Sequence, residues 1–271
     1  MLNQTKIIHA TNVSDAWVNI FNLLMAPGGH IGPIVLELEV KDGAVTEVPA
    51  IRKLLDEEML KHEKFSIEMT SFLIFPWKLW NKLGRPDLNR FTDLYIKKVF
   101  PSLKRRGPKH NSRGTYFQRM IQFSGINETV KGRSDKEVNQ LLRVLEIWEK
   151  AELKGTHPRH SALQVTIFDP AKDHHGAAQC GFPCLQQVSF TYHENILIIG
   201  AYYPTQYLFD RAYGNYLGLC HLGQFMAKQM GLIFSGLNCY IGSCHLGADI
   251  TKSALTPMKH QIEKLRAANI S

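Results

Sequence analysis

The chain has 271 residues, 44% of them hydrophobic, which excludes a disordered or fibrous protein and allows one large domain or two small ones. Its 32 Lys and Arg residues outnumber 24 Asp and Glu residues, giving a formal net charge of +8. This excess favours an anionic partner such as a nucleotide, a nucleic acid or a polyglutamylated cofactor, although it also serves solubility alone.

The first eighty residues alternate between helical and strand patterns. Residues 13–25 place apolar side chains at helical spacing behind Ser14, which predicts an amphipathic helix capped by that serine. Residues 33–40 alternate as a strand does, and residues 50–62 predict a second helix. The aromatic segment 65–80 is expected to be buried.

The middle of the chain contains a basic segment at residues 104–114, rich in Lys, Arg, Gly and Pro. This composition predicts an exposed loop, which either holds phosphate or is simply solvated. It lacks the interleaved aromatic residues of single-strand binders, so nucleic acid is not the expected partner. Residues 136–154 predict an amphipathic helix, and residues 162–168 predict a strand.

The last third of the chain predicts a hairpin and a long helix. Residues 186–193 and 195–203 are rich in β-branched and aromatic residues, with a turn near Glu194. Residues 214–230 then predict a helix. Because there is no internal repeat, low-complexity tract or linker, we expect a single domain over residues 1–271.

The cysteines indicate a reducing compartment. All five lie between Cys180 and Cys244, an odd number in a chain too long to need disulfides. The N-terminus has no signal-peptide pattern, and no apolar run reaches the roughly 18 residues that span a bilayer. We therefore expect a soluble, cytoplasmic protein without membrane partners.

One cysteine is a candidate nucleophile. Phe182-Pro183-Cys184-Leu185 enters a predicted strand, and a thiolate fixed beside a cavity there could attack an electrophilic carbon. An inert core cysteine is the alternative interpretation.

The surrounding motif, PCLQQVSF, resembles the segment of thymidylate synthase and its pyrimidine hydroxymethylase relatives in which Pro-Cys precedes a strand. That family has an asparagine 31 positions and a histidine 61 positions after the cysteine, where this chain has Asn215 and His245. NYLGLCHLGQFMAKQMGL and YIGSCHLGADI resemble the segments around these two residues. AWVNIFNLLMAPGGHIGPIVLELE resembles the N-terminal helix and strand of archaeal-type members, and TYFQRM and NQLLRVLEIWEK resemble later segments, so the similarity covers nearly the whole chain.

The resemblance implies an α/β (α+β) domain with a large mixed sheet covered by helices, paired back to back as a homodimer. It also implies that Cys184 adds to carbon 6 of a pyrimidine nucleoside or nucleotide. Carbon 5 then accepts a methyl or hydroxymethyl group from 5,10-methylenetetrahydrofolate, without a metal.

The same resemblance implies roles for further residues. Asn215 would bind the base edge and His245 a sugar hydroxyl, whereas a helix N-cap and a satisfied buried histidine are their structural alternatives. Glu68 is the nearest candidate for the catalytic glutamate.

Several family positions are changed. The arginine that binds phosphate and orients the thiolate falls on Pro204, which has neither charge nor backbone donor, while Thr205 keeps the hydroxyl of the next position. The folate-contacting aspartate falls on Tyr207, and a sugar-binding tyrosine falls on Gly247. An arginine pair falls on Ser161 and Ala162, with Arg159 nearby.

We therefore expect altered phosphate recognition, in which the anionic end of the substrate is held by other cations. Arg211, Arg159 and the segment 104–113 are the candidates.

Three other functions stay open. A catalytically degenerate nucleotide-binding or assembly protein would fit the loss of the aspartate at Tyr207. A zinc site could gather Cys180, Cys184 and the later Cys and His residues, although no paired C-x-x-C framework is present. The tyrosine-rich stretch 202–216 could stack bases or pack in the core.

Overall fold

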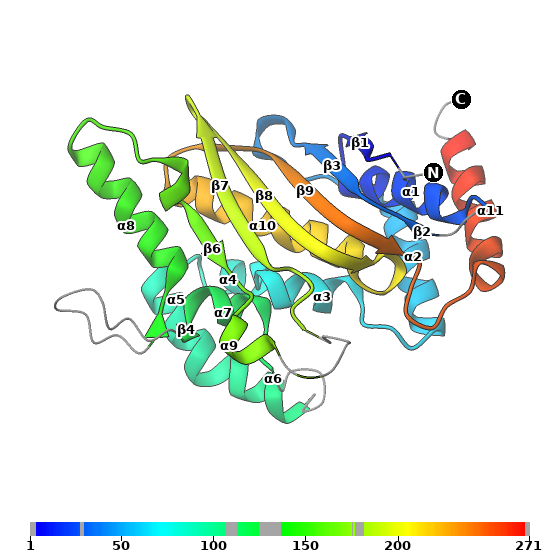
Figure 1. Cartoon of the computed structure of the whole chain (residues 1–271), viewed down its shortest axis with the longest axis horizontal. Helices are drawn as coiled ribbons and strands as arrows, with labels where there is room; N and C mark the ends of the chain where they lie inside the picture. Colours follow the sequence, from blue (N-terminus) through cyan, green and yellow to red (C-terminus); the bar gives the residue numbers. More distant parts are fainter. Residues whose placement is uncertain are drawn as a thin grey trace.

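The centre of the protein is a seven-stranded mixed sheet (Figure 1). The computed structural model describes residues 4–27, 30–106, 113–124, 137–174, 176 and 182–268. The strand order is β1-β3-β9-β8-β7-β6, and β2 pairs with β9. The strands are β1 (Lys6–Ala10), β2 (His30–Ile31), β3 (Ile34–Glu39), β6 (Gln164–Thr166), β7 (Gln187–His193), β8 (Ile196–Tyr207) and β9 (Ile233–His245).

The helices lie against this sheet and around one end of it (Figure 1). They are α1 (Val13–Met25), α2 (Pro49–Lys61), α3 (Ile67–Ile74), α4 (Trp77–Lys82), α5 (Leu88–Leu94), α6 (Phe100–Arg106), α7 (Tyr116–Ile121), α8 (Gln140–Leu153), α9 (Pro170–Asp173), α10 (Tyr213–Gln229) and α11 (Lys252–Ala268). A mixed sheet covered by helices confirms the predicted α/β (α+β) class.

The predicted hairpin is confirmed as β7 and β8, with Glu194 at the turn in the left-handed region (φ 50°). β8 continues past the predicted end at residue 203. It does so because β9 pairs with it in parallel up to the register Tyr207–His245. The sequence analysis had not assigned residues 233–245 to a strand.

The predicted long helix is confirmed as α10, which is buried on almost every side between the sheet and α3. Gly214 lets these helices approach closely, because a Cβ there would lie 2.5 Å from the Cβ of Thr70. Helix α10 therefore brings its first turn, including Asn215, into the interior.

Some predicted boundaries are wrong. Asn12 caps α1 by accepting the amide of Asp15 at 2.8 Å, because Ser14 turns inward and bonds to the hydroxyl of Tyr213 at 2.8 Å. The helix expected from residue 136 begins at Gln140, since Glu137 and Val138 form β5, which pairs with β4 (Phe123–Ser124).

The basic segment is also partly helical. Residues 104–106 form the last turn of α6, so the loop prediction is wrong there, and residues 107–112 lie outside the described part of the chain. The predicted aromatic core is confirmed at Phe75 and Trp80.

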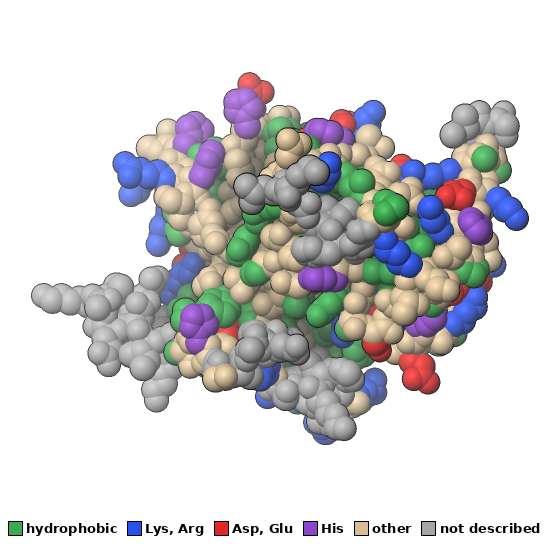
Figure 2. Space-filling model, turned by 45° about the vertical axis from the view of Figure 1, so that its right-hand side comes forward, with side chains coloured by type: hydrophobic (Ala, Val, Ile, Leu, Met, Phe, Trp, Pro, Cys, Tyr) green, Lys and Arg blue, Asp and Glu red, His purple; other side chains and the backbone are tan. Residues whose placement is uncertain are grey.

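One face of the sheet carries exposed aromatic residues, on which no helix of the described residues packs. Tyr202 and Tyr240, on neighbouring strands, stack with ring centroids 5.7 Å apart and are each 41% exposed. Figure 2 shows hydrophobic side chains among other side chains over the middle of this view, with Lys and Arg side chains at both of its ends. No described helix combines the length and hydropathy needed to cross a membrane.

Candidate active site

Cys184 lies in the segment between α9 and β7 as a half-buried thiol that forms no disulfide with another described cysteine. The hydroxyl of Tyr116, at the start of α7, accepts hydrogen bonds from the backbone amides of Leu185 and Cys184. Burial raises the pKa of this phenol far above its ordinary value, so it stays protonated. The segment carrying the thiol is therefore held by a half-buried tyrosine.

The thiol opens onto a cavity of about 360 Å³, near the lower end of the roughly 300–1,000 Å³ typical of ligand pockets. Four of the residues singled out in the sequence line it together, namely Cys184, Asn215, Arg211 and Tyr207. The others that matter for recognition are Phe65, Thr70, Tyr116, Phe182, Gln206 and Asp210.

Three nearly fully buried polar residues line this cavity with an unpaired atom each. Asn215, 3% exposed, has no hydrogen-bond partner for its Oδ1, and Thr70 has none for its Oγ1. Gln206, 1% exposed, accepts a bond from the Tyr216 hydroxyl at 2.6 Å, while its Nε2 is unpaired. An acceptor, an amide donor and a hydroxyl are thus available to a ligand with a polar edge.

Arg211 adds a cation to the same cavity. It comes from η4 (Leu208–Ala212), a π-helical turn between β8 and α10, and its guanidinium lies over the ring of Phe65 at 4.2 Å. Burial lowers the pKa of Arg211, whereas its electrostatic interactions with Tyr116, Asp210 and Cys184 act in the opposite direction. Within the described part of the chain, no carboxylate forms an ion pair with it.

Asp210, the carboxylate next to Arg211, is engaged elsewhere. Lys64 lies 3.3 Å from its Oδ1 and also pairs with Asp249, while the amide of Ala248 bonds to its Oδ2 at 3.2 Å. Asp210 therefore contacts Lys64 and Ala248 directly and interacts with Arg211 only electrostatically.

His245 and Thr205 do not line the cavity. His245 ends β9 opposite Tyr207, with ring centroids 5.9 Å apart, and its Nε2 lies 3.0 Å from Ser243 Oγ. Thr205 pairs with Ser243 on the same two strands. Tyr207 therefore connects the cavity to the histidine.

Glu68 and Arg159 also lie outside the cavity lining. Glu68, in the first turn of α3, pairs with Lys78 at 2.8 Å and lies 3.9 Å from Arg52. Arg159 is exposed and precedes the short η3 turn (His160–Ala162).

Tyr116, Gln206 and Thr70 line the cavity but were not predicted from the sequence to do so. Tyr116 lies in the segment TYFQRM, whose resemblance was noted without a role for the tyrosine. Gln206 stands between two residues that were considered, on a strand where neighbouring side chains point to opposite faces. Nothing in the sequence around Thr70 marked it as a lining residue.

Over the described residues, no group of His, Cys, Asp and Glu side chains could hold a metal ion. Cys220, Cys239 and Cys244 are fully buried, and burial raises the thiol pKa of all three, to about 12 for Cys244. They are core residues with inert thiols. Cys180 lies outside the described residues.

No protein-family model matches this chain, and no curated protein matches it in sequence. Among solved structures, the thymidylate synthase from T4 phage aligns with a TM-score of 0.35 and 17% identity, over 46% of this chain and 45% of that chain. This alignment spans less than half of the phage enzyme.

Proposed function

We propose that this protein transfers a one-carbon group to carbon 5 of a pyrimidine nucleoside or nucleotide through a covalent Cys184 adduct. One observation carries the proposal: Cys184 and Asn215, 31 positions apart in sequence, line one cavity whose buried polar atoms lack partners. This fits the resemblance of the chain to pyrimidine C1 transferases, which had rested on residue order alone.

In the proposed reaction the Cys184 sulfur forms a bond to carbon 6, and the electron pair of the 5,6 double bond makes carbon 5 a nucleophile. Carbon 5 would bond to the methylene unit of the donor and lose its proton as the bond from that unit to the donor nitrogen breaks. The unit would become methyl by taking a hydride from the tetrahydrofolate, or hydroxymethyl by adding water, and the carbon–sulfur bond would then break. Arg211, whose charge reaches Cys184, favours the thiolate that starts the sequence.

Recognition of the base is assigned to the unpaired atoms. Asn215 Oδ1 accepts from a ring N–H, and Gln206 Nε2 donates to a ring carbonyl, while the Tyr216 hydroxyl fixes the glutamine amide. A site built from such buried groups discriminates strongly, because the wrong base leaves them unpaired. Arg211 holds an anionic end, a role that proline at position 204 cannot fill.

The one-carbon donor is proposed to be 5,10-methylenetetrahydrofolate. The cavity lining fits a flat ring there, because Tyr207, 37% exposed, offers an aromatic face. Tyr207 would hold the donor, which would supply a one-carbon unit. The carboxylate of Asp210, which lines the same cavity, is already paired with Lys64. The donor would therefore be held by ring stacking rather than by a contact with this carboxylate.

The protein is further proposed to be a homodimer joined through the open sheet face. The exposed, stacked Tyr202 and Tyr240 support this, because aromatic residues are enriched in such interfaces.

His245, on β9, is the residue proposed to bind a sugar hydroxyl. It does not line the cavity itself, but its ring lies against that of Tyr207, which does.

A second function, ligand binding without catalysis, is favoured by the position of Glu68. This candidate catalytic carboxylate pairs with Lys78 outside the cavity, and the carboxylate inside it belongs to Asp210, which is already paired. The same cavity would then serve only to bind a pyrimidine.

Trapping the adduct separates the two functions. Incubation with 5-fluorodeoxyuridine monophosphate and methylenetetrahydrofolate should add their mass to the peptide containing Cys184, because fluorine cannot leave carbon 5 as a proton does. Cys184→Ser is the matched control and should stay unmodified. Retained binding of the fluoropyrimidine with an unmodified Cys184 would reject the enzyme and favour the binding protein.

A further inference from the structure

A second cavity lies beside the Cys184 cavity and contains a buried ion pair. Arg119 of α7 and Asp173 of α9 are 7% and 2% exposed, and both line this neighbouring cavity. The two cavities share Gly114. The pair is therefore placed next to the site without entering it.

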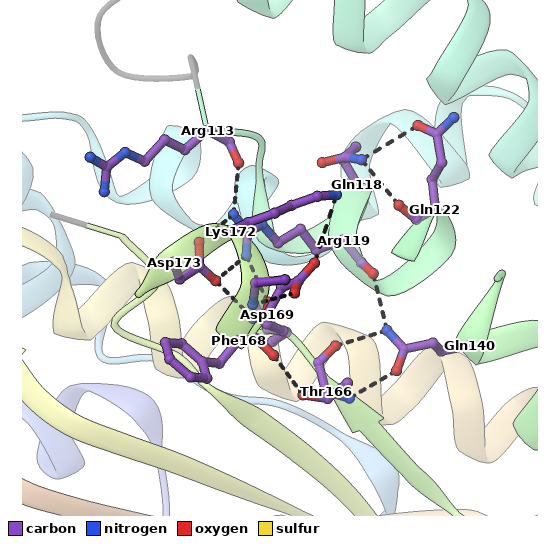
Figure 3. A network of polar contacts seen from close by, with 12 residues as sticks. Arg113, Gln118, Arg119, Gln122, Gln140, Thr166, Phe168, Asp169, Lys172 and Asp173 are labelled. Atoms are coloured by element: carbon purple, nitrogen blue, oxygen red, sulfur yellow. Dashed lines mark hydrogen bonds and ion pairs between the residues drawn. The ribbon is translucent and has the colours of Figure 1, made fainter. Parts of the chain in front are cut away.

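The Arg119 guanidinium joins three segments of chain (Figure 3). Its Nη1 and Nη2 donate to the two carboxylate oxygens of Asp173 at 2.5 and 2.8 Å. The same nitrogens donate to the carbonyl of Ile167, after β6, at 2.9 Å and to that of Arg113 at 3.1 Å. Four of its five N–H donors are thus used within the protein.

The face of the same guanidinium covers the ring of Phe182 at 4.8 Å. Phe182 lies two residues before Cys184, and its ring packs against Tyr116 with centroids 5.1 Å apart. Tyr116 in turn holds the backbone amide of Cys184. A continuous chain of contacts therefore runs from Asp173 through Arg119 and two aromatic rings to the thiol segment.

Stability alone gives a weak reason for such a pair. Removing two charges from water carries a desolvation penalty that often cancels their attraction, and apolar pairs of similar volume are frequently as stable. The paired hydrogen bonds of the guanidinium, in contrast, fix the orientation of its plane. An arginine held in this way can place its flat face against only one ring.

We propose that Arg119, oriented by Asp173, is a positioning residue that holds the Phe182–Cys184 segment against Tyr116 and so fixes the thiol at the cavity. The functional meaning of this position rests on the proposed role of Cys184 as nucleophile. Arg119 acts through Phe182 and touches no substrate.

The test measures how freely Cys184 reacts with a bulky reagent. In a Cys180→Ser background, the rate of labelling by a fluorescein maleimide is followed for each cysteine by mass spectrometry. The buried Cys220, Cys239 and Cys244 report global opening, because they are protected only while the fold is intact.

The main variant is Arg119→Met/Asp173→Asn, which removes both charges and leaves an amide oxygen to accept the Asp169 N–H that Asp173 Oδ2 accepts at 2.8 Å. Cys184 should be labelled about tenfold faster, since local opening of the segment exposes its half-buried thiol to the reagent, while the three buried cysteines stay protected. Arg119→Lys keeps the charge but not the fork, and should show a smaller change in the same direction.

The matched control is Arg143→Met/Glu146→Leu, which removes a half-exposed ion pair of 2.6 Å on α8 and should leave every cysteine unchanged. Unchanged labelling of Cys184 in both Arg119 variants would overturn the proposal. So would equal exposure of all four cysteines, because the pair would then hold the fold as a whole. No pyrimidine is used, so this result and that of the trapping experiment are independent.

Discussion

Two arginines flank Cys184, and their surroundings are opposite. Arg119 is bonded to a carboxylate and two carbonyls, and its face rests on Phe182. Arg211 also rests its face on an aromatic ring, that of Phe65, but no described carboxylate forms an ion pair with it. A satisfied buried cation holds structure, whereas an unsatisfied one beside a cavity is available to a ligand.

The same contrast separates the two cavities. The one around Arg119 contains both members of an ion pair, and its lining also carries Lys104, Arg113, Lys172 and Asp169. The one around Arg211 contains unpaired atoms of Asn215, Gln206 and Thr70. The smaller cavity, around Arg211, therefore offers a ligand buried polar atoms without partners, whereas the larger one is lined by charged groups.

The largest difference is expected in stability. Arg119→Met should lower the free energy of unfolding by about 3–5 kcal/mol, because it leaves the carboxylate of Asp173 buried without its partner. Arg211→Met should stay within about 1 kcal/mol of the native protein, since it removes an unpaired charge. Urea unfolding at pH 7 measures both, and equal losses would remove the distinction between the two arginines.

The Arg119 pair should also respond to acid. Burial alone would raise the pKa of Asp173, but its bonds to Arg119 and to the Asp169 amide outweigh burial and lower it below the ordinary value. A depressed folded pKa stabilises above the unfolded pKa of about 3.9, and this contribution is lost as the pH falls towards the folded value.

The difference in unfolding free energy between the native protein and Asp173→Asn should thus be largest near neutral pH and shrink below about pH 4. The exposed Asp93, paired with Lys97, supplies the control Asp93→Asn, whose difference should be small throughout. A difference that stays constant into acid would show that the ion pair contributes nothing as a pair.

For Arg211 the expected effect is on binding. Arg211→Met should weaken deoxyuridine monophosphate by about 10–100-fold, the size of one lost charge-assisted contact, and leave deoxyuridine nearly unchanged. The exposed Arg159, outside the cavity lining, supplies the control Arg159→Met. Isothermal titration measures all four affinities. If Arg159→Met alone weakened the monophosphate, the anion site would lie elsewhere.

Much of the fold could be predicted from local pattern. The spacing of apolar residues in α1, α8 and α10, and the β-branched arms of β7 and β8, reflect periodicities that a sequence displays directly. Strand β9 was missed because it is central and carries Gly236 and Gly242, which weaken the strand pattern. The cap of α1 was misplaced because the partner of Ser14 is Tyr213, far along the chain.

The site was less accessible to prediction. Cys184 and Asn215 were singled out by the resemblance to a known family, and they do line one cavity. Gln206 and Thr70 were not, because their importance comes from unpaired atoms, which exist only once the fold has removed every other partner. The Arg119 and Asp173 pair joins residues 54 positions apart and leaves no local pattern.

The smallest stability effect is expected at Asn215. Its Oδ1 is buried without a hydrogen-bond partner, so Asn215→Leu removes the desolvation cost of that atom and loses no hydrogen bond to it. The free energy of unfolding should therefore change by less than about 1 kcal/mol in either direction. Asn12→Ala, which deletes the bonded cap of α1, should lose about 1 kcal/mol by comparison. Binding should behave in the opposite way: Asn215→Leu should weaken deoxyuridine about tenfold, and Asn12→Ala should not. A large loss of stability in Asn215→Leu would mean that the amide serves the core, and the cavity would then lose its proposed means of recognising a base.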